Sequence, residues 1–280
     1  MLTSLIIHLK STAAANLPAS LGRAAHALLL RLIDAQEPAL AQELHDRPGL
    51  KPYTASNLVI GQRQSGSLQV QAGQSGWLRF TGLTGPVSQI LQALAAEPPR
   101  TVELDGHHFE VAGASLDPAH HPWAGRISYQ ELAAPYLLAG QSAAGHRPSL
   151  RLDFTSPTTF RSQGRYIPLP LPELVFGSLL DRWQAWAPIA LPPELRRFAA
   201  EAVALSRYDL RTRSLPYKQG GQAEAGRSGM TIVGFTGQAT FTALNRDRYW
   251  LSLLHLLAAF AFYSGVGYQT GVGLGQVRRG

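Results

Sequence analysis

The sequence predicts an α+β protein in which the order strand, helix, strand, strand, helix, strand occurs twice. Segments with the two-residue period of a strand alternate with segments that have the 3.6-residue period of a helix. A stretch rich in Gly, Ala, Ser, Pro and His, near 139–148, separates two such series. The chain has 280 residues, of which 45% are hydrophobic, and this is enough for two packed domains of ordinary size.

The first series starts with an alternating strand at 2–9. Apolar residues at helical spacing then predict a helix over 21–33 and a shorter helix over 37–45. The remaining elements complete a ferredoxin-like order: extended runs at 68–70 and 77–80, a helix at 86–96, and strands at 101–104 and 108–112.

The second series repeats the pattern. It contains a strand at 150–154, helices at 171–186 and 192–205, extended runs at 208–213 and 230–244, an amphipathic helix at 246–263 and a short last strand. The prediction is therefore two tandem ferredoxin-like (RRM-like) βαββαβ domains, the first over 1–140 and the second over 147–280.

Charge is divided unevenly between the two halves. Residues 1–140 carry 9 Lys and Arg against 10 Asp and Glu, a net charge of −1, whereas the remainder carries 16 against 8, a net charge of +8. The basic residues are 22 Arg and only 3 Lys. Since the arginine fork binds phosphate in a bidentate manner and stacks on bases, the second half is expected to grip a polyanion. A generally basic surface without a specific partner is the alternative.

Composition also bears on the compartment. The chain has no cysteine, so disulfides, thiolate metal sites and a cysteine nucleophile are excluded, and a reducing cytoplasm is the expected location. The first ten residues, MLTSLIIHLK, lack a basic leader and have too short an apolar run for a signal peptide or a membrane span. No membrane association is expected.

The C-terminal segment is unusually rich in glycine, with Gly265, Gly267, Gly271, Gly273 and Gly275. It follows a helix and does not open one, so it is neither a dinucleotide fingerprint nor a P-loop. Bare backbone of this kind can approach a phosphate chain closely and turn its amides toward the oxygens. A tight turn packed against a sheet is an equal alternative, and the adjacent arginines at 278 and 279 favour phosphate.

Several motifs resemble one family. The segments at 28–33, 38–46 and 51–56 (LLLRLI, PALAQELHD and KPYTAS) look like the N-terminal signature of the CRISPR repeat-processing endoribonucleases of the RAMP superfamily. The closing GVGYQTGVGLGQV resembles the glycine-rich loop of that superfamily. Segments typical of the same family lie between them, at 154–161, 170–180 and 233–241.

The resemblance implies two ferredoxin-like domains with a cleft between them. It further implies an endoribonuclease that needs no metal and no cofactor and cuts precursor RNA within the CRISPR repeat. The products would carry a 5′-hydroxyl and a 2′,3′-cyclic phosphate or 3′-phosphate. CRISPR repeat RNA is then the expected partner, with a CRISPR effector complex as a further one. Dimers are common among relatives, and the oligomeric state stays open.

Cleavage of this kind uses the RNA 2′-hydroxyl as nucleophile, and the protein must move two protons and stabilise a phosphorane. Histidine suits the proton transfers because its pKa lies near working pH, and a cation suits the phosphorane. His45, Lys51 and Tyr53 supply these groups within ten residues. In the family, a histidine after this leucine is commonly catalytic and the lysine assists. A histidine at a helix end can instead cap carbonyls.

His26 is the second candidate catalyst. It lies roughly 120° from the centre of the apolar stripe on its helix, by the 3.6-residue period, and so faces away from the core. Some family members use a histidine on this helix, and an ordinary exposed histidine is the alternative. A tyrosine found on the same helix in some relatives is replaced here by Leu30, so the identity of the general base is open.

Candidate RNA contacts and metal ligands complete the list. We expect contacts to RNA from four arginines and one lysine: Arg161, Arg165, Arg278, Arg279 and Lys218. Trp77 and Trp123 would stack on bases if they are not core residues. The pairs His107-His108 and His120-His121 do not predict a metal site, because neighbours on a strand point to opposite faces and no carboxylate cluster accompanies them.

Two other functions compete with a repeat endoribonuclease. A non-catalytic RNA-binding RAMP subunit of an effector complex would share the fold and the glycine-rich loop but lack the histidine chemistry. A metal-dependent hydrolase that uses the histidine pairs is a more distant third.

Overall fold

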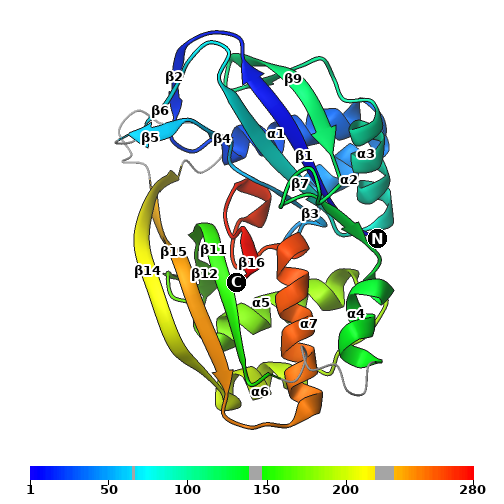
Figure 1. Cartoon of the computed structure of the whole chain (residues 1–280), viewed down its shortest axis with the longest axis vertical. Helices are drawn as coiled ribbons and strands as arrows, with labels where there is room; N and C mark the ends of the chain where they lie inside the picture. Colours follow the sequence, from blue (N-terminus) through cyan, green and yellow to red (C-terminus); the bar gives the residue numbers. More distant parts are fainter. Residues whose placement is uncertain (65–66, 139–146, 218–229) are drawn as a thin grey trace.

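The computed structural model describes residues 1–64, 67–138, 147–217 and 230–280. Two sheet-containing halves lie one above the other, with the chain's C-terminus between them (Figure 1). Each half has one main antiparallel sheet, and each main sheet is covered on one face by helices.

The main sheet of the N-terminal half has the order β3-β7-β1-β9-β8. These strands are β1 (Leu2–Ser11), β3 (Tyr53–Ala55), β7 (Ser75–Gly82), β8 (Thr101–Leu104) and β9 (His107–Ser115). Short strands β4 (Val59–Ile60) and β10 (Gly125–Ile127) extend β7 and β1. Helices α1 (Gly22–Asp34), α2 (Pro38–Asp46) and α3 (Gly85–Ala96) share its buried apolar core.

The sheet of the C-terminal half has the order β14-β15-β11-β16. Its strands are β11 (Ser149–Thr158), β14 (Val203–Tyr217), β15 (Met230–Ala243) and β16 (Val277–Arg279). Helices α5 (Pro172–Trp186), α6 (Glu194–Ala202) and α7 (Arg248–Ser264) pack on it. A hairpin of β12 (Phe160–Ser162) and β13 (Arg165–Ile167) and the one-turn helix η1 (Thr270–Val272) complete this half.

Both halves have the ferredoxin-like strand order. In each, the first strand is central, between the third strand of the repeat and the last, and the second strand is at one edge. Two helical crossovers connect these strands in the order βαββαβ. The predicted fold class is therefore confirmed.

One predicted strand was placed wrongly. Residues 68–70 do form a strand, β6 (Ser67–Val70), but it joins β2 (Ala15–Pro18) and β5 (Gln62–Gln64) in a separate three-stranded sheet. The edge position in the main sheet belongs to β3, whose three residues are all buried. A three-residue strand is too short to show a period, so nothing local in the sequence marks 53–55 rather than 68–70 as the edge strand of the main sheet.

One helix was missed, and it connects the halves. Helix α4 (Tyr129–Leu137) starts with a capping box formed by Ser128 and Glu131, but Pro135 interrupts its pattern. Tyr129 is buried in the core of the C-terminal half, with its ring centroid 5.4 Å from that of Trp183, while its hydroxyl donates to the Leu83 carbonyl at 2.9 Å. The two halves thus share a core, and most of the expected linker (139–146) lies outside the described residues.

Among the described helices, none is long and apolar enough to span a bilayer.

Candidate active site

A cavity of about 380 Å³ lies between the two halves, at the glycine-rich loop. The N-terminal half contributes His26 from α1 and the segment 49–51, and the C-terminal half contributes Arg182 from α5 and the loop residues 267–272. The site is therefore built only when the two halves are together. Its size is within the ordinary range for small-ligand sites.

His26 is held in this cavity by Tyr53. The His26 Nε2 lies 2.8 Å from the Tyr53 Oη, and the two rings are stacked with centroids 5.7 Å apart. Burial, together with the nearby Lys51 and His45, lowers the pKa of His26. Burial also raises the pKa of Tyr53, so its hydroxyl keeps its proton at neutral pH. The result is a fixed, mainly neutral imidazole with its other nitrogen, Nδ1, available for chemistry.

Lys51 has a structural role at the end of α2 in addition to lining the cavity. Its ammonium donates to the carbonyls of Leu44, His45 and Arg47 in the last turn of α2, with the Leu44 oxygen at 2.7 Å. These are carbonyls that a helix end leaves unpaired. Burial, and then the charge of Arg47, lower the pKa of Lys51. Lys51 therefore caps α2 and adds positive charge beside His26.

His45 lies outside the described lining of the cavity. Its side chain is exposed on the last turn of α2, and its carbonyl accepts from Lys51. Its charge nevertheless contributes to the lowered pKa of His26, so the two imidazoles are electrostatic neighbours. The structure brings together His26, Lys51 and Tyr53, with His45 at the margin.

The glycine-rich loop uses most of its glycine amides to hold its own shape. Those of Gly265, Gly267, Gly273 and Gly275 donate to the Ala261 carbonyl, the Ser178 hydroxyl, the Ala55 carbonyl and the Pro157 carbonyl, respectively. All four residues have positive φ, and a Cβ on Gly275 would lie 2.1 Å from the Val266 oxygen. These four glycines thus match the tight-turn alternative.

Gly271 is the exception among the five. It lines the cavity, and a Cβ added to it would meet only the Tyr53 ring, at an ordinary 3.5 Å. Gly271 is therefore the glycine at which bare backbone faces the cavity without being needed for the fold.

Arg182 was missed in the sequence. It is fully buried on α5, and its guanidinium donates to the Ser178 hydroxyl at 2.8 Å, the Gly267 carbonyl at 2.7 Å and the Thr270 hydroxyl at 3.3 Å. Burial lowers the pKa of Arg182 to about 10, so it stays charged at neutral pH. It anchors the loop and places a fixed positive charge behind the cavity. The one sequence feature that could have identified Arg182 is the presence of an arginine in a helix otherwise expected to face the core.

Two family models cover most of the chain. The CRISPR Cas6 N-terminal domain matches residues 1–134, and the CRISPR-associated endoribonuclease Cas6 matches residues 152–277. The chain belongs to the Cas6 family of endoribonucleases.

Relatives extend over nearly the whole chain. A Cas6 endoribonuclease of Mycobacterium tuberculosis is 28% identical over 261 residues, which cover 93% of this chain and 72% of that protein. A Cas6 of Streptococcus thermophilus is 25% identical over 157 residues, covering 55% and 59%.

Solved Cas6 structures have the same fold. Thermus thermophilus Cas6 superposes with a TM-score of 0.70 at 29% identity, over 100% of this chain and 98% of that one. A Cas6 product complex gives a TM-score of 0.76 at 28% identity, over 100% of both chains. The resemblance of the sequence motifs to the CRISPR repeat-processing endoribonucleases is thereby confirmed.

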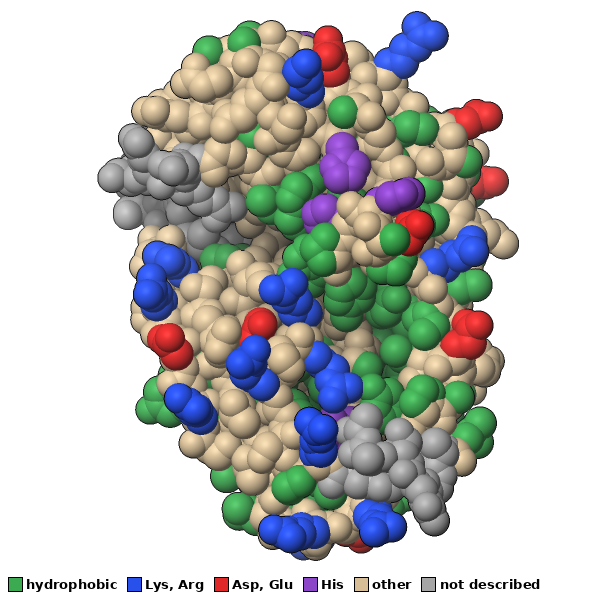
Figure 2. All heavy atoms as spheres, in the orientation of Figure 1, with side chains coloured by type: hydrophobic (Ala, Val, Ile, Leu, Met, Phe, Trp, Pro, Cys, Tyr) green, Lys and Arg blue, Asp and Glu red, His purple; other side chains and the backbone are tan. Residues whose placement is uncertain are grey.

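The arginines expected to contact RNA in this Cas6 chain lie on the surface of the C-terminal half, where Lys and Arg side chains gather (Figure 2). Arg161 and Arg165 are on the β12–β13 hairpin. Arg161 also lines a surface hollow, together with Arg182. Arg278 faces Asp153 at 4.0 Å and lies over the Trp123 ring. Arg279 donates to the Tyr136 hydroxyl at 2.7 Å. Lys218 lies outside the described residues.

The histidine pairs lie apart from the cavity. His107 bonds to the Ser11 hydroxyl at 2.7 Å, and His121 packs against Trp77 with ring centroids 4.7 Å apart. Within 1–64, 67–138, 147–217 and 230–280, no group of three or more His, Asp or Glu side chains is close enough together to hold a metal ion.

Proposed function

We propose that this Cas6 chain cleaves CRISPR precursor RNA within the repeat, by attack of a 2′-hydroxyl on the adjacent phosphate and without a metal ion. The observation that carries the proposal is the His26–Tyr53 pair in a cavity closed by the glycine-rich loop. Solved Cas6 relatives include complexes with product and with a substrate mimic, and also a histidine-to-alanine mutant. The product and substrate-mimic complexes support repeat RNA as the substrate.

The reaction needs two proton transfers. The 2′-oxygen forms a bond to phosphorus as its proton passes to a base, and the bond from phosphorus to the 5′-oxygen breaks as that oxygen receives a proton from an acid. The products are a 2′,3′-cyclic phosphate and a 5′-hydroxyl. No oxidant, reductant or cofactor takes part.

His26 fits the role of base. If its Nε2–H donates to the Tyr53 oxygen, Nδ1 keeps a lone pair for the 2′-hydroxyl proton. Its lowered pKa keeps this form populated below neutral pH. Tyr53, fully buried, acts through His26 as a positioning residue.

His45 fits the role of acid, because it is exposed and free to turn toward a leaving 5′-oxygen at the cavity margin. The buried charge of Arg182 and the ammonium of Lys51 then stabilise the additional negative charge of the phosphorane. Gly271 lets the RNA backbone approach closely. The expected contacts from Arg161, Arg165, Arg278, Arg279 and Lys218 hold the rest of the repeat. Homodimer formation and delivery of the product to an effector complex stay predictions.

The test is single-turnover cleavage of the repeat RNA from the same genome, in EDTA, by wild type, His26→Ala and His45→Ala. Wild type should cut at one site and fail on RNA with 2′-deoxy at the scissile nucleotide. Each histidine variant should lose about 10²–10⁴-fold in rate, the usual contribution of an acid or base.

A second substrate separates the two roles. RNA with sulfur in place of the bridging 5′-oxygen has a leaving group that needs no acid. It should restore His45→Ala and leave His26→Ala slow. The opposite result would exchange the roles. Tight binding without cutting by wild type would sink the cleavage proposal and favour an RNA-binding subunit. Activity that EDTA abolishes would favour a metal-dependent hydrolase.

A further inference from the structure

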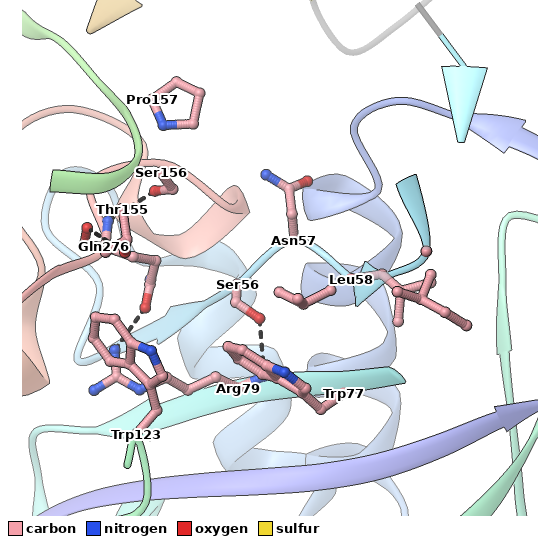
Figure 3. Close-up of a pocket in the computed structure, with 13 residues that line it drawn as sticks. Ser56, Asn57, Leu58, Trp77, Arg79, Trp123, Thr155, Ser156, Pro157 and Gln276 are labelled. Carbon is pink, nitrogen blue, oxygen red and sulfur yellow. Dashed lines mark hydrogen bonds between the residues drawn. The ribbon is translucent and has the colours of Figure 1, made fainter. Parts of the chain in front are cut away.

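A second cavity, of about 390 Å³, opens between the two halves (Figure 3). The N-terminal half lines it with the segment 56–61, Trp77 and Arg79 of β7, and Trp123. The C-terminal half lines it with residues 155–157 and Gln276. None of the described residues lines both this cavity and that of His26. Figure 2 shows hydrophobic and histidine side chains along the same boundary between the halves.

Two indole rings form much of the cavity wall. Trp77 is half-buried, and the ring of His121 meets it at an angle of 63°. The His121 Nδ1 accepts from the Trp123 backbone amide at 3.1 Å, which fixes the imidazole and thereby the wall. Trp123 stacks on Phe262 with centroids 5.5 Å apart. The cavity therefore presents rigid, flat aromatic surfaces, one of which reaches solvent.

The floor of the cavity carries an unusual charge. Arg79 is fully buried, and its guanidinium donates to the Ser4 hydroxyl at 2.7 Å, the Gln276 side-chain oxygen at 2.6 Å and the Phe262 carbonyl. Among described residues, no carboxylate accepts from it. Burial lowers the pKa of Arg79 to about 9, which leaves it charged at neutral pH. The faces of the Trp123 and Phe262 rings lie against the guanidinium, with its Cζ 4.6 and 4.5 Å from the two ring centroids.

Gln276 presents an unused donor at the same floor. Because arginine can only donate, the atom of Gln276 that faces Arg79 must be Oε1, and Nε2 is then the other atom. Among the described residues, this buried Nε2 finds no hydrogen-bond acceptor. The backbone of Gln276 is itself fixed, since its amide donates to the Ser156 hydroxyl at 2.8 Å and its carbonyl accepts from Thr155. A buried donor held in place without a partner calls for an acceptor from a ligand.

We propose that this cavity holds one unpaired nucleobase of the RNA, stacked on Trp77, with an acceptor atom of its edge that accepts from the Gln276 Nε2. The proposal rests on the proposed function, because it takes RNA as the substrate. Flat aromatic walls beside an arginine that already donates to three protein oxygens fit a base better than a phosphate, for which the exposed arginines are better placed. The donor sets the position of the base edge, since each of the four bases carries a carbonyl oxygen or a ring nitrogen that can accept from it.

The base in this cavity and the phosphate at His26 would be two fixed points on one RNA strand. Such a cavity would set which phosphate reaches the histidine. It would thus act in binding and register, and not in the proton transfers.

The test is a binding measurement that does not depend on cleavage. The ligand is the repeat RNA from the same genome, with 2′-deoxy at the scissile nucleotide so that it is not cut. In a series of such RNAs, the nucleotide at each unpaired position in turn is replaced by an abasic residue. Affinity is measured for wild type, Trp77→Ala and Trp77→Phe, with Trp250→Ala as a control. Trp250 is also half-buried and stacked, on Phe198, but it lies at the far end of α7.

We expect Trp77→Ala to weaken binding by about 5- to 150-fold, the range for loss of one stacked base, and Trp77→Phe and Trp250→Ala to have little effect. At one position, the abasic residue should weaken wild type by the same factor and Trp77→Ala not at all. Gln276→Glu keeps the bond from Arg79 and loses the donor, so it should weaken binding of the intact RNA and reduce the effect of the abasic residue at that position. The Gln276 arm remains informative if Trp77→Ala fails to fold.

The proposal would be overturned if, at every position, the losses of affinity caused by Trp77→Ala and by the abasic residue simply added. Wild-type affinity in both Trp77→Ala and Gln276→Glu would overturn it as well. The two proposals fail separately. Coupling without cleavage by wild type would sink only the catalytic proposal, whereas cleavage without coupling would sink only the nucleobase cavity.

Discussion

The two halves use the same helix of the same fold in opposite ways. Each half places its first helix against the cavity, α1 with His26 and α5 with Arg182. His26 bonds to one partner and keeps a ring nitrogen open to the cavity, whereas Arg182 is fully buried and donates to three residues of the α5 turn and the loop. The comparison teaches that one half supplies groups that react and the other supplies the frame that closes over them.

The strongest way to break this comparison is to remove Arg182. Arg182→Met should lower the free energy of unfolding by about 3 kcal/mol, because buried acceptors on Gly267 and Ser178 lose a charged donor. Urea denaturation measures the effect. Arg196→Met is the matched control, since Arg196 is half-exposed in a surface ion pair with Asp181 and should cost less than about 1 kcal/mol. His26→Ala should lower the free energy of unfolding less, by about 1 kcal/mol, because it removes a single hydrogen bond to the Tyr53 hydroxyl. Equal stability of Arg182→Met and wild type would refute the framing role.

A pair of glycine variants sharpens the same contrast within the loop. Gly275→Ala forces a left-handed residue and a contact with the Val266 carbonyl, so it should lower the free energy of unfolding by about 2 kcal/mol. Gly271→Ala should change it by less than about 0.5 kcal/mol. Thermal unfolding checks both. If Gly271→Ala slows cleavage while the fold is intact, the RNA backbone passes at that residue. A destabilised Gly271→Ala would instead place Gly271 among the structural glycines.

The smallest expected effect concerns the proton on His26. A base with a lowered pKa stays deprotonated to a lower pH, so the acid limb of the single-turnover rate should have its midpoint below 6.5. Lys51→Gln removes one of the charges that lower this pKa, and the midpoint should then move upward. Lys10→Gln serves as the control. Lys10 lies near the C-terminal end of β1, opposite Ser75 of β7, so this change should leave the midpoint in place. A downward movement with Lys51→Gln would contradict the assignment of the acid limb to His26.

The sequence was sufficient for those elements whose apolar residues recur over three turns or more. The helices predicted at 21–33 and 86–96 differ from α1 and α3 by one residue at each end or less. The failures have physical reasons. β3 is too short to show alternation, and α4 contains Pro135 and buries its apolar face against the other half, which no local pattern reveals.

The candidate site was predictable in its residue types but not in their division of labour. His26 and Tyr53 are 27 residues apart and meet only because β3 lies beside α1. Lys51 was identified as a catalytic assistant, but the carbonyls that it caps belong to the end of α2, which sequence alone does not position. Arg182 and Arg79 were missed because arginines in buried segments are unremarkable until their partners in the other half are visible.

The position of helix α4 affects the order in which the two halves can fold during synthesis on the ribosome. Its buried residues pack in the core that includes α5 and α7, which are synthesised later. When residues 1–138 have emerged, Tyr129 and Leu132 still have no apolar partner of that kind. Until the second half is translated, the N-terminal half therefore exposes these apolar side chains of α4. A chain interrupted between the halves would keep them exposed to chaperones and proteases.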